Sequence, residues 1–304
     1  MNQLVILKKI LGDVPEKGSF HYKQPRQIVY ANYTLILFDV HLLHNEIVEV
    51  QVTIPNNSKS REALPLVLCN HSHGGNYHVG KKEILEGAEY LASPSFAETL
   101  SQLGFATISI DARGFGTRAV LTEAELVKTA LIHGSTLWGL MLNDLVYLLD
   151  FIEFQQQYHF SEIGALGMSM GGLMSWWLAA LDSRIKWIVD IAAQVDLETL
   201  EKQNLLNKHG HYYYVPSFLK YFSTTDIQKL IAPRRRLSIV GNSDLNCPIE
   251  GVIKLEKFLT KAYHQMGKDN QWHSHIVKGG HEETLEMRQI WVNFLKEGYS
   301  NDCR

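Results

Sequence analysis

Cysteine is scarce in this chain of 304 residues: there are three, Cys69, Cys247 and Cys303, far apart in the sequence. They form no C-x-x-C pair, so the sequence predicts neither a disulfide framework nor a zinc site built on cysteines. The expected location is therefore the reducing cytoplasm. An apolar share of 45% is enough for a full hydrophobic core, and the length fits a single α/β domain over residues 1–304.

Long apolar runs and an excess of one charge are also missing. No stretch of about 18 apolar residues occurs, so no membrane span is expected, and the four-residue run Leu4–Leu7 is too short for a signal-peptide core. The formal net charge is −3, and the cationic cluster is Arg234–Arg236. We interpret this cluster as the solvated entrance to a strand, and nucleic acid is not an expected partner.

What the sequence does contain is a regular alternation of strand-like and helix-like segments. Five short continuous apolar runs are typical of strands buried on both faces of a parallel sheet: residues 64–70, 105–110, 163–166, 185–191 and 237–240. Between and after them, helical apolar spacing predicts helices at residues 95–103, 137–154, 172–181, 252–263 and 283–295. This alternation predicts a doubly wound, mostly parallel sheet with right-handed crossovers.

The N-terminal part and two longer segments depart from this pattern. Residues 33–40 and 46–54, with a break at His44 and Asn45, predict an antiparallel pair at the edge of the sheet. Residues 114–134 and 195–233 interrupt the alternation, and the second segment is dense in aromatic side chains. Insertions at the carboxyl edge of such a sheet commonly shape a ligand pocket, so we expect residues 195–233 to form a small lid or pocket wall. A small satellite core is the alternative.

The segment Gly167-Met168-Ser169-Met170-Gly171 follows directly on the apolar run 163–166. A serine between glycines at this point is typical of a nucleophile elbow, where a sharp strand-to-helix turn leaves the serine oxygen exposed. A serine hydroxyl is a poor nucleophile at neutral pH, and it needs a base, a carboxylate to orient that base, and donors for an oxyanion. Ser169 is therefore the candidate nucleophile.

The acid and the base are expected at the ends of later strands. Asp244 follows the run 237–240, and His281 follows the strand-like residues 275–277. Serine, acid and histidine in this chain order form one of the recurring catalytic triads, and parallel strands bring their carboxyl ends to the same edge of a sheet. We therefore predict a triad of Ser169, Asp244 and His281. Asp196, which follows the run 185–191, is the alternative acid.

An oxyanion needs backbone N–H donors, one of them from the residue after the nucleophile, here Met170. The second donor should come from the loop after the run 64–70, which reads His71-Ser72-His73-Gly74-Gly75-Asn76. Small residues in this loop let the backbone approach a ligand closely. We favour the amide of His73 as the second donor.

Two other groups of residues could carry chemistry. His71, His73 and His78 lie close together, but no carboxylate or thiolate stands at ligand spacing apart from Cys69 inside a predicted strand, so no metal is expected. Asp111 and Arg113 close the run 105–110, and we expect them to hold the neighbouring loop through ion pairs and backbone contacts. The alternative is that Arg113 binds a substrate carboxylate.

With these motifs the chain resembles the α/β-hydrolase superfamily, and within it the dienelactone hydrolase and acetyl xylan esterase-like branch. The resemblance runs from about residue 60 to 295 and is carried, in the right order, by His71–Gly75, Asp111–Gly116, Gly167–Gly172, Ile231–Arg234 and Gly280-His281. It implies an α/β-hydrolase fold and a carboxylic-ester hydrolase without a cofactor. Ser72 stands where such proteins usually show glycine, and dienelactone hydrolases proper use cysteine as the nucleophile.

The expected function is that of a soluble serine esterase acting through an acyl-enzyme on a small-molecule ester, with a short acyl group such as acetyl. Two alternatives stay open: a peptidase of the prolyl-oligopeptidase kind, and a non-catalytic binding protein on the same scaffold. The first shares the triad, but the chain has no room for the extra domain that usually restricts entry to such peptidases. Association into a homo-oligomer is also open.

Overall fold

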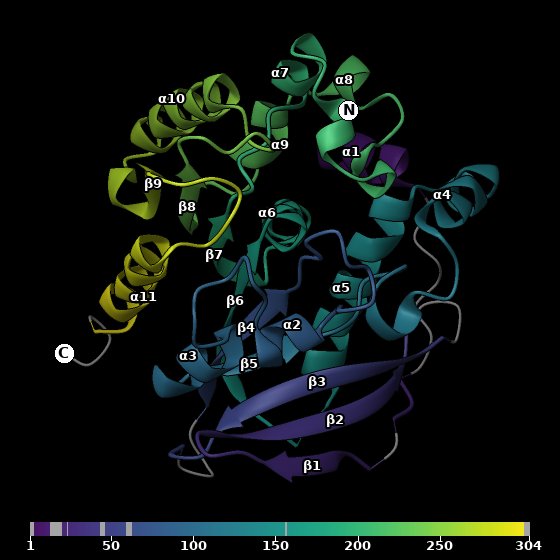
Figure 1. Cartoon of the computed structure of the whole chain (residues 1–304), viewed down its shortest axis with the longest axis vertical. Coiled ribbons are helices and arrows are strands. Elements are labelled where there is room, and N and C mark those ends of the chain that lie inside the picture. Colours follow the sequence, from purple (N-terminus) through teal and green to yellow (C-terminus); the bar gives the residue numbers. More distant parts are fainter. Residues whose placement is uncertain are drawn as a thin grey trace.

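The computed structural model describes residues 3–12, 20–22, 24–42, 46–58, 63–155 and 157–300. In this part of the chain nine strands form one sheet, in the order β1-β2-β3-β5-β4-β6-β7-β8-β9 (Figure 1). The antiparallel edge consists of β1 (Arg26–Val29), β2 (Tyr33–His41) and β3 (Ile47–Pro55). The other strands are parallel to one another: β4 (Leu64–Asn70), β5 (Ala106–Ser109), β6 (Phe160–Met168), β7 (Ile185–Ile191), β8 (Arg235–Gly241) and β9 (Trp272–Val277).

This architecture confirms the expected mostly parallel sheet with an antiparallel N-terminal edge, and it adds one strand. The added strand is β1, which lies before the two predicted strands in the sequence and pairs with the first of them, β2. All four of its residues are exposed, so it lacks the alternation of apolar and polar residues that marks a half-buried strand. The expected break at His44 and Asn45, and Cys303, lie outside the described residues.

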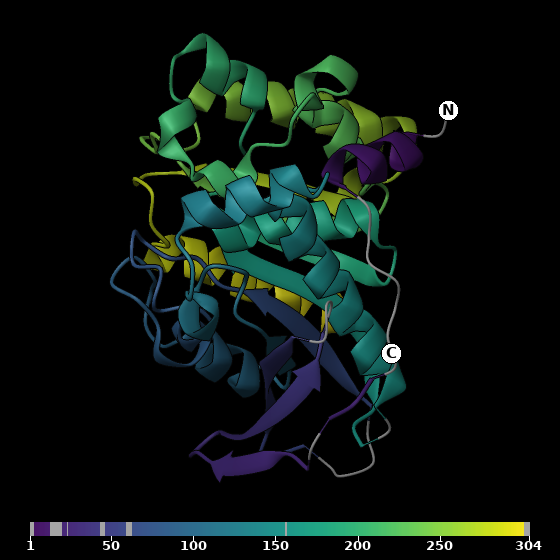
Figure 2. The ribbon, with the colours of Figure 1, turned by 90° about the vertical axis from the view of Figure 1, so that its right-hand side faces the viewer.

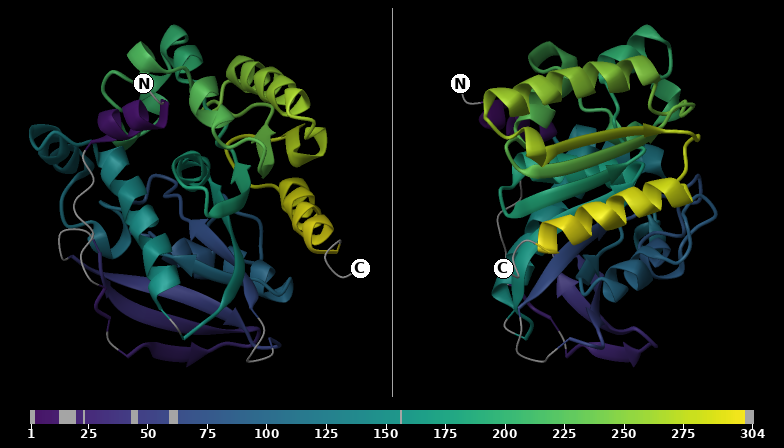
Figure 3. Two further views of the ribbon diagram at one scale, coloured as in Figure 1. Left: turned by 180° about the vertical axis from the view of Figure 1, so that it is seen from behind. Right: turned by 90° about the vertical axis from the view of Figure 1, so that its left-hand side faces the viewer.

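The parallel strands are buried on both faces, as their continuous apolar runs predict. In β4, Leu66 and Leu68 belong to one hydrophobic core, and Val67 and Cys69 belong to the core on the other face. The first core packs under α1 (Gln3–Leu11), α5 (Leu137–Phe154) and α6 (Met170–Leu181). The second packs under α2 (Lys82–Glu86), α3 (Phe96–Gln102) and α11 (Leu285–Ser300), and Figure 3 shows α5 and α11 on opposite sides of the sheet.

Helix starts follow from capping residues that the sequence displays. The Ser95 side chain accepts a hydrogen bond from the Glu98 amide at 3.3 Å and begins α3. Thr136 accepts from the Gly139 amide at 2.9 Å and begins α5, so the predicted helix 137–154 has the expected bounds. These side-chain oxygens satisfy N–H groups that have no partner within the first helical turn. No helix in the described part of the chain is long and apolar enough to cross a bilayer.

The two interrupting segments are partly helical. Residues 114–134 include α4 (Glu123–Ile132). Residues 195–233 carry α7 (Leu197–Lys202), α8 (Phe218–Tyr221), α9 (Thr224–Lys229) and short 3-10 turns at Leu206–Lys208 and His211–Tyr213. Figure 2 shows this insertion and the strands β1–β3 at opposite ends of the molecule. Tyr213, Phe218 and Phe222 of the insertion are buried in the first core, so part of the segment serves as core.

The cluster Arg234–Arg236 does stand at a strand entrance, because β8 begins at Arg235, but the expectation that it is solvated was wrong. Arg236 on β8 is fully buried, and its Nε lies 2.8 Å from Asp190 Oδ2 on β7. The Arg234 guanidinium donates to five backbone carbonyls, and that of Arg235 lies over the ring of Phe294. Burying a guanidinium is costly unless acceptors surround it, and here both neighbouring residues and segments distant in the sequence supply them.

Candidate active site

Ser169 lies at the turn between β6 and α6, where its backbone φ is +53°. A residue with a side chain adopts this region at a cost of about 1–3 kcal/mol, and it does so mostly at functional sites. The turn is tight: a Cβ at Gly167 would collide with the backbone of Gly171, and one at Gly171 would collide with the backbone of Asn70. The two glycines of the motif are therefore required by the close approach of strand and helix.

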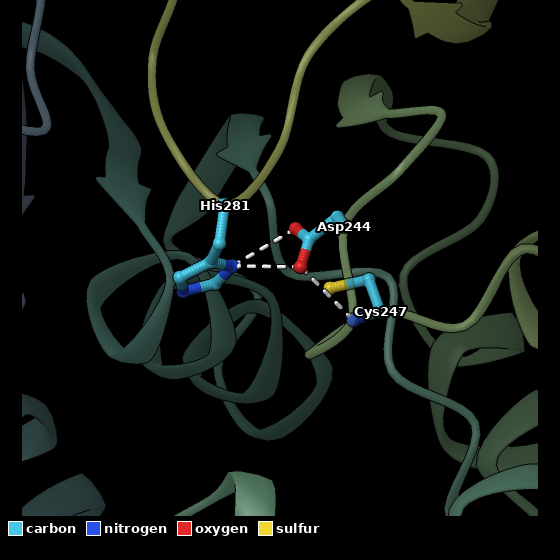
Figure 4. Close-up of side chains that lie close together, drawn as sticks. All are labelled: Asp244, Cys247 and His281. Carbon is cyan, nitrogen blue, oxygen red and sulfur yellow. Dashed lines mark hydrogen bonds and ion pairs between the residues drawn. The ribbon is translucent and has the colours of Figure 1, made fainter.

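The structure brings Ser169, His281 and Asp244 together. The Ser169 hydroxyl lies 2.7 Å from His281 Nε2, and His281 Nδ1 lies 2.9 and 3.0 Å from the two carboxylate oxygens of Asp244. Asp244 Oδ1 also accepts from the amides of Asn246 and Cys247, which hold the carboxylate in place. Figure 4 shows the Asp244 carboxylate facing the imidazole, with Cys247 beside it.

Asp196, the alternative acid, serves another purpose in this structure. Its carboxylate caps α7 by accepting from the amide of Thr199 at 3.2 Å and from its hydroxyl at 2.7 Å. The same oxygen lies 2.9 Å from Lys254 Nζ on α10 (Ile249–Gln265). The carboxylate beside His281 is therefore that of Asp244, and Asp196 ties two helices together.

Among the described residues, the two amides expected to bind an oxyanion have no other hydrogen-bond partner. Met170 is the first residue of α6, and its N–H is one of the donors that a helix leaves free at its N-terminus. The amide of His73 lies in the loop after β4, and neither amide donates a hydrogen bond within the described residues. The His73 imidazole is occupied elsewhere, because Nδ1 accepts from the Gly75 amide and Nε2 lies 3.1 Å from the Tyr212 hydroxyl.

Glu83 on α2 is a residue that the sequence analysis missed. Its side chain is fully buried, and its two oxygens accept from the Ser72 amide at 3.0 and 3.1 Å. The Tyr90 hydroxyl donates to the same carboxylate. Glu83 thus fixes the backbone at Ser72, the residue that precedes His73. Because the Ser72 amide already donates to Glu83, it is not available as an oxyanion donor. No pattern in the sequence distinguishes Glu83 from Glu86, its exposed neighbour on the same helix.

Burial raises the pKa of Glu83 to about 7, and the nearby Glu283 adds to this effect, whereas the hydrogen bonds from Tyr90 and Ser72 oppose it. We expect Glu83→Gln to gain stability relative to wild type as the pH rises from 5 to 8. In the unfolded chain this carboxyl ionises near its ordinary pKa of 4.5, whereas the folded protein retains the proton up to about pH 7. Wild type therefore loses stability in this window, by about 3 kcal/mol at most, and the glutamine variant does not.

Urea unfolding at pH 5, 6, 7 and 8 measures this difference. The matched control is Glu86→Gln, because Glu86 lies on the same helix with its side chain exposed. The control should show no change in relative stability across the series. A constant difference between wild type and Glu83→Gln at all four pH values would contradict the prediction.

A cavity of about 440 Å³ opens over Ser169. Its lining includes His281, the loop after β4, and four residues of the insertion: Lys208, His209, Gly210 and Tyr212. Residues 195–233 therefore do form a wall of the pocket, in addition to their part in the core. Burial lowers the pKa values of His73 and His209 to about 4, so both imidazoles are neutral near pH 7.

Asp111 and Arg113 hold loops beside this site. Asp111 accepts from the backbone and the ammonium of Lys81 at 2.7 and 2.8 Å and from Thr117. Arg113 donates to the buried Asp144 at 2.8 Å and is not part of the cavity lining over Ser169. The structure thus agrees with the loop-holding interpretation of this pair.

Among the described residues, one set of three could hold a metal ion: Asp244, Cys247 and His281. The aspartate and the histidine are already hydrogen-bonded to each other. Burial raises the pKa of the Cys247 thiol well above its usual range, which disfavours the thiolate that a metal would bind. We therefore assign these residues to the candidate triad and not to a metal centre. Within the described part of the chain, the histidines of the loop after β4 belong to no such set.

Residues 65–265 match the family model described as alpha/beta hydrolase fold. The chain belongs to the α/β-hydrolase fold family. This α/β hydrolase is 46% identical over 239 residues to a Bacillus subtilis (strain 168) protein named provisionally as hydrolase YtaP, and the match covers 79% of this chain and 80% of that protein.

Solved structures show the same fold at low sequence identity. A glucuronoyl esterase from Solibacter usitatus superposes with a TM-score of 0.70 at 14% identity, covering 98% of this α/β hydrolase and 91% of that chain. An acetyl xylan esterase from Paenibacillus sp. R4 superposes with a TM-score of 0.62 at 16% identity, covering 92% and 89%. At these identities the likeness establishes the fold alone.

Proposed function

We propose that this α/β hydrolase cleaves carboxylic esters through an acyl-enzyme, with Ser169 as nucleophile, His281 as general base and Asp244 as the carboxylate that orients it. One observation carries the proposal: the Ser169 hydroxyl lies 2.7 Å from His281 Nε2, whose Nδ1 lies 2.9 Å from Asp244. A nucleophile within hydrogen-bonding reach of a base that is itself oriented by a third group is the arrangement that activates a serine.

The proposed reaction proceeds in two halves. Ser169 Oγ attacks the ester carbonyl carbon while its proton passes to His281 Nε2, and the oxyanion is bound by the amides of Met170 and His73. His281 then donates this proton to the leaving alcohol as the C–O bond breaks, which leaves an acyl group on Ser169. Water attacks the acyl carbonyl while one of its protons passes to His281 Nε2, and His281 returns this proton to Ser169 Oγ as the acyl C–O bond breaks and the carboxylic acid is released. Asp244 holds the proton of the imidazole on Nδ1 and stabilises the imidazolium.

A short acyl group fits the site best. The cavity over Ser169 is modest, at about 440 Å³, and its wall is rich in polar groups from His73, Lys208 and Asn246. A long alkyl chain gains little from such a wall, since the gain from burial is proportional to the apolar area removed from water. The name acetyl xylan esterase, given to one of the similar structures, is in line with this proposal.

A series of p-nitrophenyl esters tests the proposal. We expect kcat/KM to be highest for acetate or propionate and at least about 10-fold lower for octanoate, because the longer alkyl chain would displace water from the polar groups of the wall without replacing its hydrogen bonds. An aminoacyl p-nitroanilide serves as the amide control. Faster cleavage of that amide than of p-nitrophenyl acetate would contradict an esterase and favour a peptidase. Absence of turnover, together with no labelling of Ser169 by a fluorophosphonate, would contradict any serine hydrolase.

A further inference from the structure

Among the described residues that line the cavity over Ser169, Lys208 is the one with a permanent charge, and the Asp244 carboxylate behind this lining is bound to His281. Lys208 lies at the end of the Leu206–Lys208 turn, and none of the described lining residues is an aspartate, a glutamate or an arginine. The Lys208 side chain is exposed, and its ammonium has no ion pair or hydrogen bond among the residues that the structure describes. The net charge of the whole chain is −3, so this local charge does not reflect a generally basic protein.

Lys208 lies on the wall that adjoins the triad acid and base. His209, the next residue, donates from Nε2 to the Asn246 carbonyl at 2.8 Å and so ties the insertion to the loop that carries Asp244. Asn246 lines the cavity on the same wall. The two proposed oxyanion donors come from other segments, the start of α6 and the loop after β4.

The positions of His281 and of the oxyanion donors indicate where the alcohol part of a bound ester lies. The leaving alcohol receives its proton from His281, so it must lie toward the wall formed by the Asp244 loop and the insertion. A lysine ammonium without a carboxylate partner on that wall attracts a negative charge on the alcohol. Resting on the proposed esterase function, we infer that Lys208 makes the enzyme select esters whose alcohol part carries a carboxylate or another anionic group.

A pair of substrates that differ in one charge tests the inference. The pair is 4-acetoxybenzoate, whose leaving group is anionic, and its neutral methyl ester, and the measured quantity is the ratio of their kcat/KM values. Lys208→Met should lower this ratio by about 5-fold, the scale of a partly exposed ion pair, and Lys208→Glu by about 20-fold. Raising the salt concentration from 20 to 500 mM should lower the wild-type ratio toward that of Lys208→Met, because salt screens exposed charges.

The matched control is Lys202→Met. Lys202 is an exposed lysine at the end of α7 in the same insertion, and it does not line the cavity. This control should leave the ratio unchanged. Equal ratios in wild type, Lys208→Met and Lys208→Glu would overturn the inference.

A third ester tests whether Lys208 acts on the alcohol part or on the acyl part of the substrate. Mono-4-nitrophenyl fumarate carries its charge on the acyl part, and its trans double bond prevents the carboxylate from attacking its own ester; Lys208→Met should change its kcat/KM by less than 2-fold. A loss as large as that for 4-acetoxybenzoate would overturn the placement on the alcohol side. If wild type cleaves the neutral methyl ester but Lys208 has no effect on selectivity, the esterase proposal stands and this inference fails. If wild type cleaves none of these esters, the proposed function fails first.

Discussion

Ser169→Ala should lower kcat for p-nitrophenyl acetate by about 10⁴-fold or more while the protein keeps its fold. The members of a triad act as a unit, so loss of the nucleophile removes almost the whole contribution of the triad. Residual turnover would come from direct attack of water on the bound ester, with the amides of Met170 and His73 stabilising the oxyanion. Alanine keeps the Cβ of the serine, so the strained backbone at φ +53° is unchanged. Circular dichroism and the thermal unfolding midpoint check the fold.

Ser72→Ala is the matched control for this experiment. Ser72 also lines the cavity, but its contact with Glu83 is made through the backbone amide, which alanine retains. We expect less than a 10-fold change in kcat for this variant, and labelling by a fluorophosphonate as in wild type. Ser169→Ala should not be labelled. Full turnover by Ser169→Ala would end the proposal that this serine is the nucleophile.

Asp244→Asn should lower kcat by about 10³- to 10⁴-fold with little change in KM. An asparagine has nearly the same shape as aspartate, but it can donate a hydrogen bond to Nδ1 and so favours the tautomer whose Nε2 carries the proton and cannot accept one from Ser169. It also carries no charge to stabilise the imidazolium. The comparable loss in serine proteases, where the orienting carboxylate was replaced in this way, is about 10⁴-fold. Steady-state kinetics on p-nitrophenyl acetate measure the effect.

Asp196→Asn separates the two candidate acids. Its carboxylate contacts Thr199 and Lys254 and lies in a different network from His281. Asparagine is also a good helix N-cap, and the lost ion pair involves a lysine that is 40% exposed, so we expect a stability loss within about 1 kcal/mol. The kcat of this variant should stay within about 3-fold of wild type. A larger loss of kcat in Asp196→Asn than in Asp244→Asn would reverse the assignment.

Most elements could be placed from the sequence because their signals are local. β4 and β7 begin and end where the apolar runs 64–70 and 185–191 do, since a strand buried on both faces needs apolar residues at almost every position. β1 escaped prediction because an exposed edge strand has no buried face to impose a pattern. β1 is part of the sheet only because it forms backbone hydrogen bonds with the edge of β2.

The candidate triad was accessible from the sequence for a related reason. Ser169, Asp244 and His281 each follow the end of a parallel strand, and parallel strands deliver their carboxyl ends to one edge of the sheet. The choice between Asp244 and Asp196 was different, because both follow strands. It depended on which loop reaches the imidazole, and this is a property of the folded chain.

By itself the sequence determined the parallel core of the sheet, the tight turn at Ser169 and the identity of the residues that end its strands, since apolar periodicity and glycine spacing are properties of neighbouring residues. The tertiary structure alone decided which charged groups are buried and which are free. Glu83 is buried against Ser72 and Tyr90, Arg236 against Asp190, and Lys208 in the cavity wall has no ion-pair or hydrogen-bond partner among the described residues. The physical reason is that the cost of removing a charge from water must be compensated by hydrogen-bonding or oppositely charged groups, and only folding brings these groups into contact.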